Sequence, residues 1–262
     1  MKPLILITND DGILSPGLLA AAEAVDSLGD LLIVAPRTQQ TAMSRGYPKG
    51  EEIGIIEKFD LLINGRQVEG YGVTGSPAQA VSHAVLELAE RKPALCVSGI
   101  NYGENIGLNI IASGTVGAAF EADTYDIPAI AVSQEVNLEL HHSTTYSHMS
   151  WETAIYFTRY FAEKILNEGL SPKIAVLNLN IPASATPKTP IRLTTQSRQN
   201  YFVFKTPDKR DFSKGYKLKL DLIIDKENLE HSSDIQAIVY DKVVSVTPLT
   251  WDLTSEIGWK NI

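Results

Sequence analysis

The side chains best suited to chemistry in this sequence are two adjacent aspartates, Asp10 and Asp11, near the amino end of the chain. They follow residues 4–7, a short continuous run of leucine and isoleucine that is typical of a buried parallel strand. In an open α/β sheet, ligands bind beyond the carboxyl ends of the strands, where this pair would lie. Neighbouring carboxylates repel each other, and a divalent cation would remove that repulsion. The pair is therefore a candidate metal site, although Asn-Asp-Asp-Gly is also an ordinary turn sequence.

Two polar loops follow other predicted strands and could reach the same edge of the sheet. Residues 37–46 carry hydroxyl and amide side chains together with Arg45, although a solvated loop would have the same composition. Residues 99–107 contain three glycines and two asparagines, Asn101 and Asn105. An asparagine carbonyl oxygen is a good neutral ligand for a hard cation that two carboxylates already hold. An all-oxygen site of this kind suits Mg²⁺ or Mn²⁺.

A third polar segment, Ser113-Gly114-Thr115, opens a predicted helix that extends to about residue 124. Small residues with hydroxyls at a helix N-terminus suit a phosphate group, because the free N–H groups and the helix dipole both favour an anion. An ordinary Ser/Thr cap has the same residues, and the Gly-Lys-Ser/Thr ending of a P-loop is absent from this segment. The segment alone therefore indicates a phosphate site only weakly.

Alternating strands and helices are needed to bring these loops together, and the sequence predicts them. The predicted strands are residues 4–7, 31–35, 94–98, 127–133 and 173–179, and the predicted helices are residues 16–28, 78–90, 114–124 and 147–167. An Asn-Gly pair at 64–65 predicts a hairpin within residues 53–71. From residue 183 onward, strand-like pieces occur at 191–195, 201–205, 217–224 and 243–247. We therefore predict an α/β core over residues 1–182 and a hairpin-rich C-terminal appendage over residues 183–262, not an independent domain, that contributes oligomer contacts.

Composition narrows the class of protein. The chain has 262 residues, 44% of them hydrophobic, and a net charge of −8, which does not suit a protein that coats nucleic acid, so no duplex partner is expected. A single cysteine, Cys96, excludes a disulfide framework and a thiolate metal site. The five histidines show no metal-ligand spacing. No apolar run approaches the length of a membrane span or a secretion signal, so we expect a cytoplasmic protein without membrane contact.

Five motifs occur in order along most of the chain. They are Ile7-Thr8-Asn9-Asp10-Asp11-Gly12 with Ser15-Pro16-Gly17, then Ala35-Pro36-Arg37 through Ser44, then Ser98-Gly99-Ile100-Asn101 with Gly103, Asn105 and Gly107, then Ser113-Gly114-Thr115-Val116, and finally Val244-Ser245-Val246-Thr247-Pro248-Leu249. Each motif is weak alone, but in this order they resemble the SurE family, the survival protein E nucleotidases and acid phosphatases. Residues 75–80 depart from the family pattern, which affects the expected nucleotide preference and none of the expected ligands.

The resemblance implies a Rossmann-like catalytic core with helices on both faces, one divalent cation (Mg²⁺ or Mn²⁺) and hydrolysis of nucleoside 5′- or 3′-monophosphates. Carried over position by position, it implies a metal site formed by Asp10, Asp11, Ser44 and Asn101. It likewise implies a phosphate site formed by Asn105, Ser113, Gly114 and Thr115. We expect water activated by the cation to attack phosphorus, with Asp10 or Asp11 as the candidate general base. A homodimer or homotetramer is expected.

Other functions compete with this interpretation. A haloacid-dehalogenase-like phosphatase also places carboxylates after its first strand, but its nucleophilic aspartate would fall at Asn9, and an amide cannot serve that role. An NAD-binding dehydrogenase would need Gly-x-Gly-x-x-Gly where this chain has two aspartates. A non-catalytic sensor of nucleotides or metals would have the same composition, and only turnover of a phosphomonoester separates it from an enzyme.

Overall fold

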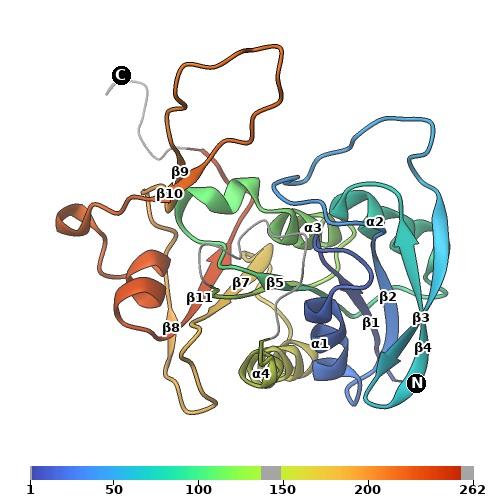
Figure 1. Ribbon diagram of the computed structural model, residues 1–262. Coiled ribbons are helices and arrows are strands. Elements are labelled where there is room, and N and C mark those ends of the chain that lie inside the picture. Colours follow the sequence, from blue (N-terminus) through green and yellow to red (C-terminus); the bar gives the residue numbers. More distant parts are fainter. Residues whose placement is uncertain (1, 137–148, 255–262) are drawn as a thin grey trace.

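A nine-stranded sheet forms the centre of the protein (Figure 1). The computed structural model describes residues 2–136 and 149–254. The middle of the sheet is parallel and contains, in spatial order, β4 (Arg66–Val73), β2 (Asp30–Pro36), β1 (Leu4–Thr8), β5 (Leu95–Tyr102), β6 (Ala129–Gln134) and β7 (Val176–Ile181). At one edge β3 (Ile56–Ile63) is antiparallel to β4. At the other, β11 (Val244–Leu249) is antiparallel to β7 and parallel to β8 (Ile191–Leu193).

Helices cover both faces of the sheet because both faces of the parallel strands are apolar. In β1, Ile5 and Ile7 belong to one hydrophobic cluster, and Leu4 and Leu6 belong to a second. The first cluster lies beneath α1 (Pro16–Val25) and α4 (Glu152–Glu168), and the second lies beneath α2 (Pro77–His83) and α3 (Gly114–Asp123). The predicted α/β class with a mostly parallel sheet is confirmed.

Several element boundaries differ from those predicted. The strand expected at 94–98 continues to Tyr102, so Asn101 lies within β5. The helix expected at 147–167 begins at Glu152, and its first two expected residues, 147 and 148, lie outside the described part of the chain. The helix expected at 78–90 is α-helical only to His83 and then forms a π-helical turn, η1 (Ala84–Leu88).

The hairpin predicted from the Asn-Gly pair at 64–65 joins β3 and β4. Asn64 and Gly65 adopt φ angles of 47° and 78°. Left-handed conformations at both central residues are those of a type I′ turn, which asparagine and glycine tolerate best. The turn chemistry alone was therefore sufficient to place this connection.

The region after residue 182 is divided between two sheets. Two of its predicted strands, β8 and β11, extend the central sheet, so the core continues beyond residue 182. The other two, β9 (Phe202–Phe204) and β10 (Leu220–Leu222), form a separate antiparallel pair that projects from the body (Figure 1). A small hydrophobic cluster holds this pair against the body; it consists of Ile106, Tyr201, Leu229, Ile235 and Ile238.

The described helices do not include one that is both long enough and apolar enough to cross a membrane.

Candidate active site

Asp10 and Asp11 lie just past the end of β1, and the turn that carries them is built by the residue before them. The Asn9 side-chain oxygen accepts a hydrogen bond from the Gly12 N–H at 3.1 Å, and its amide group donates to the Gly12 carbonyl at 3.3 Å. This turn buries both aspartates, whose residues are only 5% and 4% exposed. Asn9 therefore has a structural role that fixes the direction of the carboxylate pair.

Asp10 packs directly against the start of α3. The Thr115 hydroxyl donates to Asp10 Oδ1 at 2.5 Å, and the Thr115 backbone N–H also bonds Asp10. Gly114 has no side chain here for a steric reason: a Cβ at that position would lie 2.8 Å from both Cβ and Oδ2 of Asp10. The Gln40 N–H donates to the Asp10 carbonyl at 2.7 Å. Three of the predicted site residues therefore meet at the N-terminus of α3.

Asp11 connects the pair to two other loops. Its Oδ1 accepts from the Gln39 side chain at 3.2 Å, and its Oδ2 accepts from the Tyr102 N–H at 3.4 Å. Tyr102 follows Asn101, so the end of β5 lies beside the carboxylate pair. The Asn101 amide group donates to the Gly103 carbonyl at 2.6 Å, and this bond uses its nitrogen and leaves its oxygen as an acceptor.

The electrostatics of the pair favour a bound cation. Burial raises the pKa of Asp10 from its ordinary value of 3.8 to about 6. Burial and repulsion from Asp10 raise the pKa of Asp11 to about 7. Two ionised carboxylates in this position are unfavourable without a positive charge, so their oxygens fit a divalent metal. Within residues 2–136 and 149–254, no three His, Cys, Asp or Glu residues cluster in a metal-binding arrangement, so further ligands would be neutral oxygens such as that of Asn101.

Ser44, the other predicted metal ligand, has different neighbours. Its hydroxyl donates to the Ile111 carbonyl at 2.8 Å, and its N–H donates to the Ala112 carbonyl at 3.1 Å. Its backbone lies so close to α3 that a Cβ on Gly117 would be 2.1 Å from the Ser44 carbonyl oxygen. These contacts hold Ser44 against the segment before α3, rather than against either aspartate.

Asn105 is held by buried polar groups on two neighbouring strands. Asn180 on β7 accepts from the Asn105 N–H at 2.8 Å, and the side chains of Asn178 and Asn180 both donate to the Asn105 carbonyl, at 2.9 and 3.2 Å. The Asn105 amide group donates to Ser133 Oγ on β6 at 2.9 Å. All three partners are completely buried. Within residues 2–136 and 149–254, the Asn105 amide group donates only to Ser133, so its second N–H remains for a ligand such as a phosphate oxygen.

Ser113 acts as the N-cap of α3, since its Oγ accepts from the Val116 N–H at 3.1 Å. The ordinary cap described for this motif is therefore present. Thr115 is bound to Asp10, which leaves the Gly114 N–H in the first turn as a donor that points out of the helix. The structure thus places Ser113, Gly114 and Thr115 next to the aspartate pair, at the positive end of α3.

Several contacting residues were not predicted from the sequence. Gln39 lies in a uniformly polar loop, where nothing distinguishes it from its neighbours. Asn178 and Asn180 do carry a signal, because two asparagines two positions apart interrupt an otherwise aliphatic strand and must share one face of the sheet. A buried strand tolerates such amides only when they have partners.

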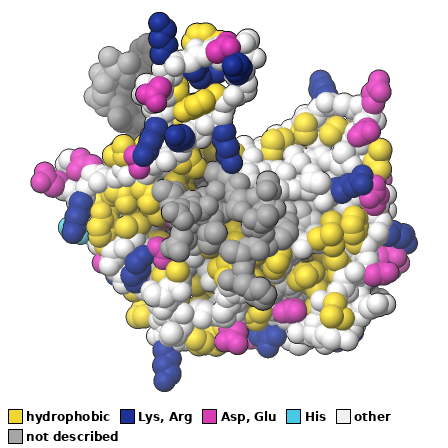
Figure 2. All heavy atoms as spheres, viewed as in Figure 1, with side chains coloured by type: hydrophobic (Ala, Val, Ile, Leu, Met, Phe, Trp, Pro, Cys, Tyr) yellow, Lys and Arg dark blue, Asp and Glu magenta, His cyan; other side chains and the backbone are white. Residues whose placement is uncertain are grey.

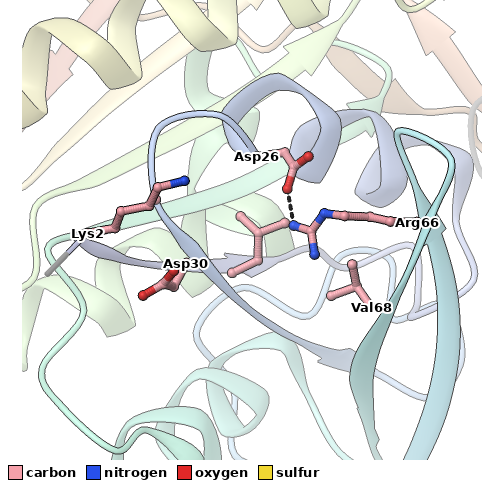
Figure 3. A pocket seen from close by; sticks show the side chains of 7 residues that line it. Lys2, Asp26, Asp30, Arg66 and Val68 are labelled. Carbon is pink, nitrogen blue, oxygen red and sulfur yellow. Dashed lines mark hydrogen bonds and ion pairs between the residues drawn. The ribbon is translucent and has the colours of Figure 1, made fainter.

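A cavity of about 490 Å³ lies elsewhere, beside the amino ends of β1 and β2 (Figure 3). It is lined by Lys2, Asp26, Gly29, Asp30, Leu31, Arg66 and Val68. Figure 3 shows Arg66 pointing at Asp26, with which it forms an ion pair. Asp30 is paired with Arg91 at 2.5 Å. The cavity lies at the opposite end of the strands from the aspartate pair and its carboxylates are neutralised, so it is a poor candidate for the catalytic site.

Comparison with known proteins agrees with the motifs. Residues 5–203 match the family model described as "Survival protein SurE". The 5′-nucleotidase SurE of Methanocella arvoryzae is 39% identical over 256 residues, covering 96% of this chain and 93% of that protein. The 5′-nucleotidase SurE of Methanosarcina barkeri is 35% identical over 271 residues, covering 100% of this chain and 97% of that protein. The crystal structure of the SurE protein from Aquifex aeolicus superposes with a TM-score of 0.77 at 29% identity, covering 99% and 98% of the two chains.

Proposed function

Because this chain belongs to the SurE family, we propose that it hydrolyses nucleoside monophosphates to a nucleoside and inorganic phosphate. The observation that carries the proposal is the buried pair Asp10–Asp11, packed against the N-terminus of α3. Carboxylates for a cation and helix N–H groups for an anion then lie side by side, an arrangement suited to metal-assisted phosphomonoester hydrolysis.

Asp10, Asp11 and Asn101 would hold the cation, with Ser44 as the further ligand that family resemblance suggests. A bound Mg²⁺ or Mn²⁺ would act as a Lewis acid that polarises a phosphoryl oxygen. Buried carboxylates with raised pKa values support this assignment, since the cation compensates the negative charge that burial makes costly.

The chain supplies donors for the other phosphoryl oxygens. The free N–H of the Asn105 amide and the first turn of α3, which Ser113 caps and Gly114 opens, provide hydrogen bonds and a positive dipole. The attacking group is water, and Asp10 or Asp11 accepts its proton. The hydrogen bonds of Asn178 and Asn180 fix Asn105, and the close packing of Gly114 fixes Asp10. The donors and the base therefore keep their positions as negative charge develops on the phosphoryl oxygens.

A panel of 5′- and 3′-nucleoside monophosphates, assayed with chelator, Mg²⁺ or Mn²⁺, tests the proposal. We expect phosphate release with metal and none with excess chelator, and loss of several orders of magnitude in kcat for Asp10→Asn with a native circular dichroism spectrum. Full activity in excess chelator would exclude a requirement for a divalent metal. Tight nucleotide binding without phosphate release under every condition would instead identify a non-catalytic sensor.

The proposed enzyme is also expected to be a homodimer or homotetramer with contacts from the C-terminal region. Light scattering of the full-length protein should give the mass of a dimer or tetramer, whereas a deletion of residues 227–262 would also remove β11 from the central sheet. A full-length protein that is monomeric at micromolar concentration would contradict this.

A further inference from the structure

The loop of residues 37–55, which joins β2 to β3, reaches the candidate active site without core packing of its own. None of its residues is buried, and it arches past α2 in Figure 1. Figure 2 shows basic and acidic side chains over the part of the molecule where Figure 1 places this loop. Long loops without secondary structure are uncommon in compact domains and are usually functional. Since no side chain of the loop is buried, hydrogen bonds and ion pairs must set its position.

The first part of this loop contacts both aspartates. The Gln39 side chain donates to Asp11 Oδ1 at 3.2 Å. The Gln40 N–H donates to the Asp10 carbonyl at 2.7 Å. Ala42 then has a φ of 59°, a left-handed conformation that costs free energy for alanine. A loop that is free to relax would leave this conformation, so contacts beyond Ala42 are needed to keep Gln39 against Asp11.

A buried carboxylate on α3 supplies the charged part of these contacts. The Glu121 side chain is 3% exposed, and its Oε2 accepts from Arg45 Nε at 2.5 Å. Its Oε1 accepts from the Ser82 hydroxyl on α2 at 2.9 Å. The Tyr47 hydroxyl lies 3.0 Å from Ser82 Oγ and donates to it, because Ser82 gives its own proton to Glu121. In the part of the chain that the structure describes, Arg45 is the only cation paired with Glu121, so both ends of the pair depend on this contact.

The start of α2 holds the residues that follow Arg45. The Ser76 hydroxyl donates to the Gly46 carbonyl at 2.6 Å, and Gln79 Nε2 donates to the Pro48 carbonyl at 3.0 Å. Gln79 Oε1 accepts from the Ser76 N–H at 3.0 Å, as part of a capping box. The oxygen of Gln79 therefore serves the helix, and its nitrogen serves the loop. Both residues lie within 75–80, where the sequence departs from the SurE pattern.

We propose that Glu121 and Gln79 are positioning residues for the cation site. Together they hold residues 45–48 against α2 and α3, an arrangement called the clamp below, and the clamp keeps Gln39 against Asp11. The inference rests on the proposed function and deepens it, because it names the residues that maintain the geometry of Asp11 for a divalent cation. Both residues act through the loop and do not contact the aspartates themselves.

The affinity for Mn²⁺ alone, measured by isothermal titration calorimetry at pH 8, tests this role. Glu121→Gln should raise the Kd about tenfold, at the lower end of the range for residues that orient metal ligands. Asp26→Asn is the matched control, because it makes the same charge change in an ion pair with Arg66 at the opposite end of the strands. Saturating Mn²⁺ should restore kcat for adenosine 5′-monophosphate in Glu121→Gln, which a general loss of structure would prevent. Equal Kd values in Glu121→Gln and the control overturn the proposal.

A second variant separates the clamp from the stability of α2. Gln79→Glu keeps the oxygen that accepts from Ser76 and removes the nitrogen that donates to Pro48. An acid in the first turn suits the capping box and the helix dipole, so a role in helix stability alone predicts an unchanged or higher Tm and unchanged Mn²⁺ affinity. The clamp predicts weaker Mn²⁺ binding, although an added negative charge would by itself attract the cation. Unchanged or tighter binding overturns the role of Gln79.

Hydrogen exchange in chelator tests the clamp without metal or turnover. The N–H groups of Gln40, Ser44 and Gly46 are hydrogen-bonded to backbone carbonyls and report on the loop. We expect them to exchange faster in Glu121→Gln and in Gln79→Glu than in the Asp26→Asn control. Unchanged exchange overturns the proposal and leaves the proposed function intact. Faster exchange in a protein that neither binds Mn²⁺ nor releases phosphate would show that the clamp holds the loop, and would refute the proposed function.

Discussion

Asn180 holds the peptide unit of Asn105 through both ends of its side chain, accepting from the Asn105 N–H at 2.8 Å and donating to the Asn105 carbonyl at 3.2 Å. A completely buried residue on a core strand thereby fixes a loop residue that is proposed to contact phosphate. The position of Asn105 is thus set by the sheet, and the loop's own conformational preferences matter less.

Replacing Asn180 with leucine should lower kcat/KM by about 5- to 150-fold, since leaving buried polar groups unsatisfied costs about 1–3 kcal/mol. Thr153→Val is the matched control, because it removes a part-buried 3.1 Å hydrogen bond from the Thr153 hydroxyl to the Ala185 carbonyl, and neither residue contacts Asn105. If Asn180 acts through Asn105, the loss should largely disappear in an Asn105→Ala background. The same loss in both backgrounds would indicate a purely structural role.

Neutralising one carboxylate should stabilise the protein in chelator. At pH 8, above the pKa of about 7 for Asp11, both aspartates are charged and repel each other. Asp11→Asn should raise Tm in chelator and abolish the rise in Tm that Mg²⁺ or Mn²⁺ gives the unmodified protein. Differential scanning fluorimetry with and without metal measures both effects. A variant that metal stabilises as strongly as the unmodified protein would exclude Asp11 as a ligand.

Gly114→Ala should reduce activity more than stability. The new methyl group would lie 2.8 Å from the Asp10 carboxylate and displace it, whereas a helix otherwise tolerates alanine well. We expect kcat to fall by about tenfold or more, as when a preorganised catalytic group is lost. The matched control is Gly215→Ala, because a Cβ there would meet no atom within 4 Å. Unchanged kinetics in Gly114→Ala would mean that Asp10 does not need its present position.

Glu104 should make stability depend on pH. Burial, which outweighs its hydrogen bond with Tyr201, raises the pKa of Glu104 from 4.5 to about 7. The folded state therefore holds a proton more tightly than the unfolded state, and this contribution is full below about pH 4.5 and lost as the pH rises through 7. It amounts to roughly 3 kcal/mol.

Glu104→Gln keeps a neutral group, so its free energy of unfolding in urea should decline less than that of the unmodified protein between pH 4.5 and 7. Asp10 and Asp11 titrate in both proteins, so their contributions cancel when the two free energies of unfolding are subtracted. Parallel pH profiles for the two proteins would refute the prediction.

Hydrolysis should proceed with inversion at phosphorus. Asn9 is committed to the turn through Gly12 and cannot act as a nucleophile, and both aspartates are assigned to the cation. A chiral thiophosphate ester labelled with oxygen isotopes, turned over in isotopically distinct water, reports the stereochemistry. One displacement by water inverts the configuration, whereas a phosphoenzyme requires two displacements and retains it. Retention, or a trapped phosphoaspartate or phosphoserine, would falsify direct attack.

The parallel core was predictable because each of its strands is a short aliphatic run bounded by turn residues. In β1 every residue is buried, and successive side chains pack on opposite faces of the sheet. The apolar run, its length and its flanking residues therefore all indicated a buried parallel strand. The membership of β11 in the same sheet was not predictable. Val244–Leu249 has the same β-forming character whether it pairs with β7 or with a hairpin, and only tertiary packing decides between them.

The place of the aspartate pair at the edge of the sheet was predictable because it follows a buried strand, although the same residues are also common in ordinary turns. Their partners were harder to identify. Gln39 contacts Asp11 from a loop whose sequence is uniformly polar. The position of the Ser44 side chain depends on the backbone angles of its loop, including the φ of 51° at Ser44 itself. Local sequence reports which residues can bind, whereas the direction of a loop side chain depends on contacts with distant segments.

The pairing of β11 between β7 and β8 has a consequence for synthesis of the chain on the ribosome. In the part of the chain that the structure describes, β8 bonds to the central sheet only through β11, which is made much later. While residues 194–243 emerge, β7 has an open edge and β8 has no partner in the sheet. An exposed edge of this kind is a template for pairing with other chains. Stalled or truncated products that stop before Val244 should therefore aggregate during translation, even though every proposed catalytic residue has already been made.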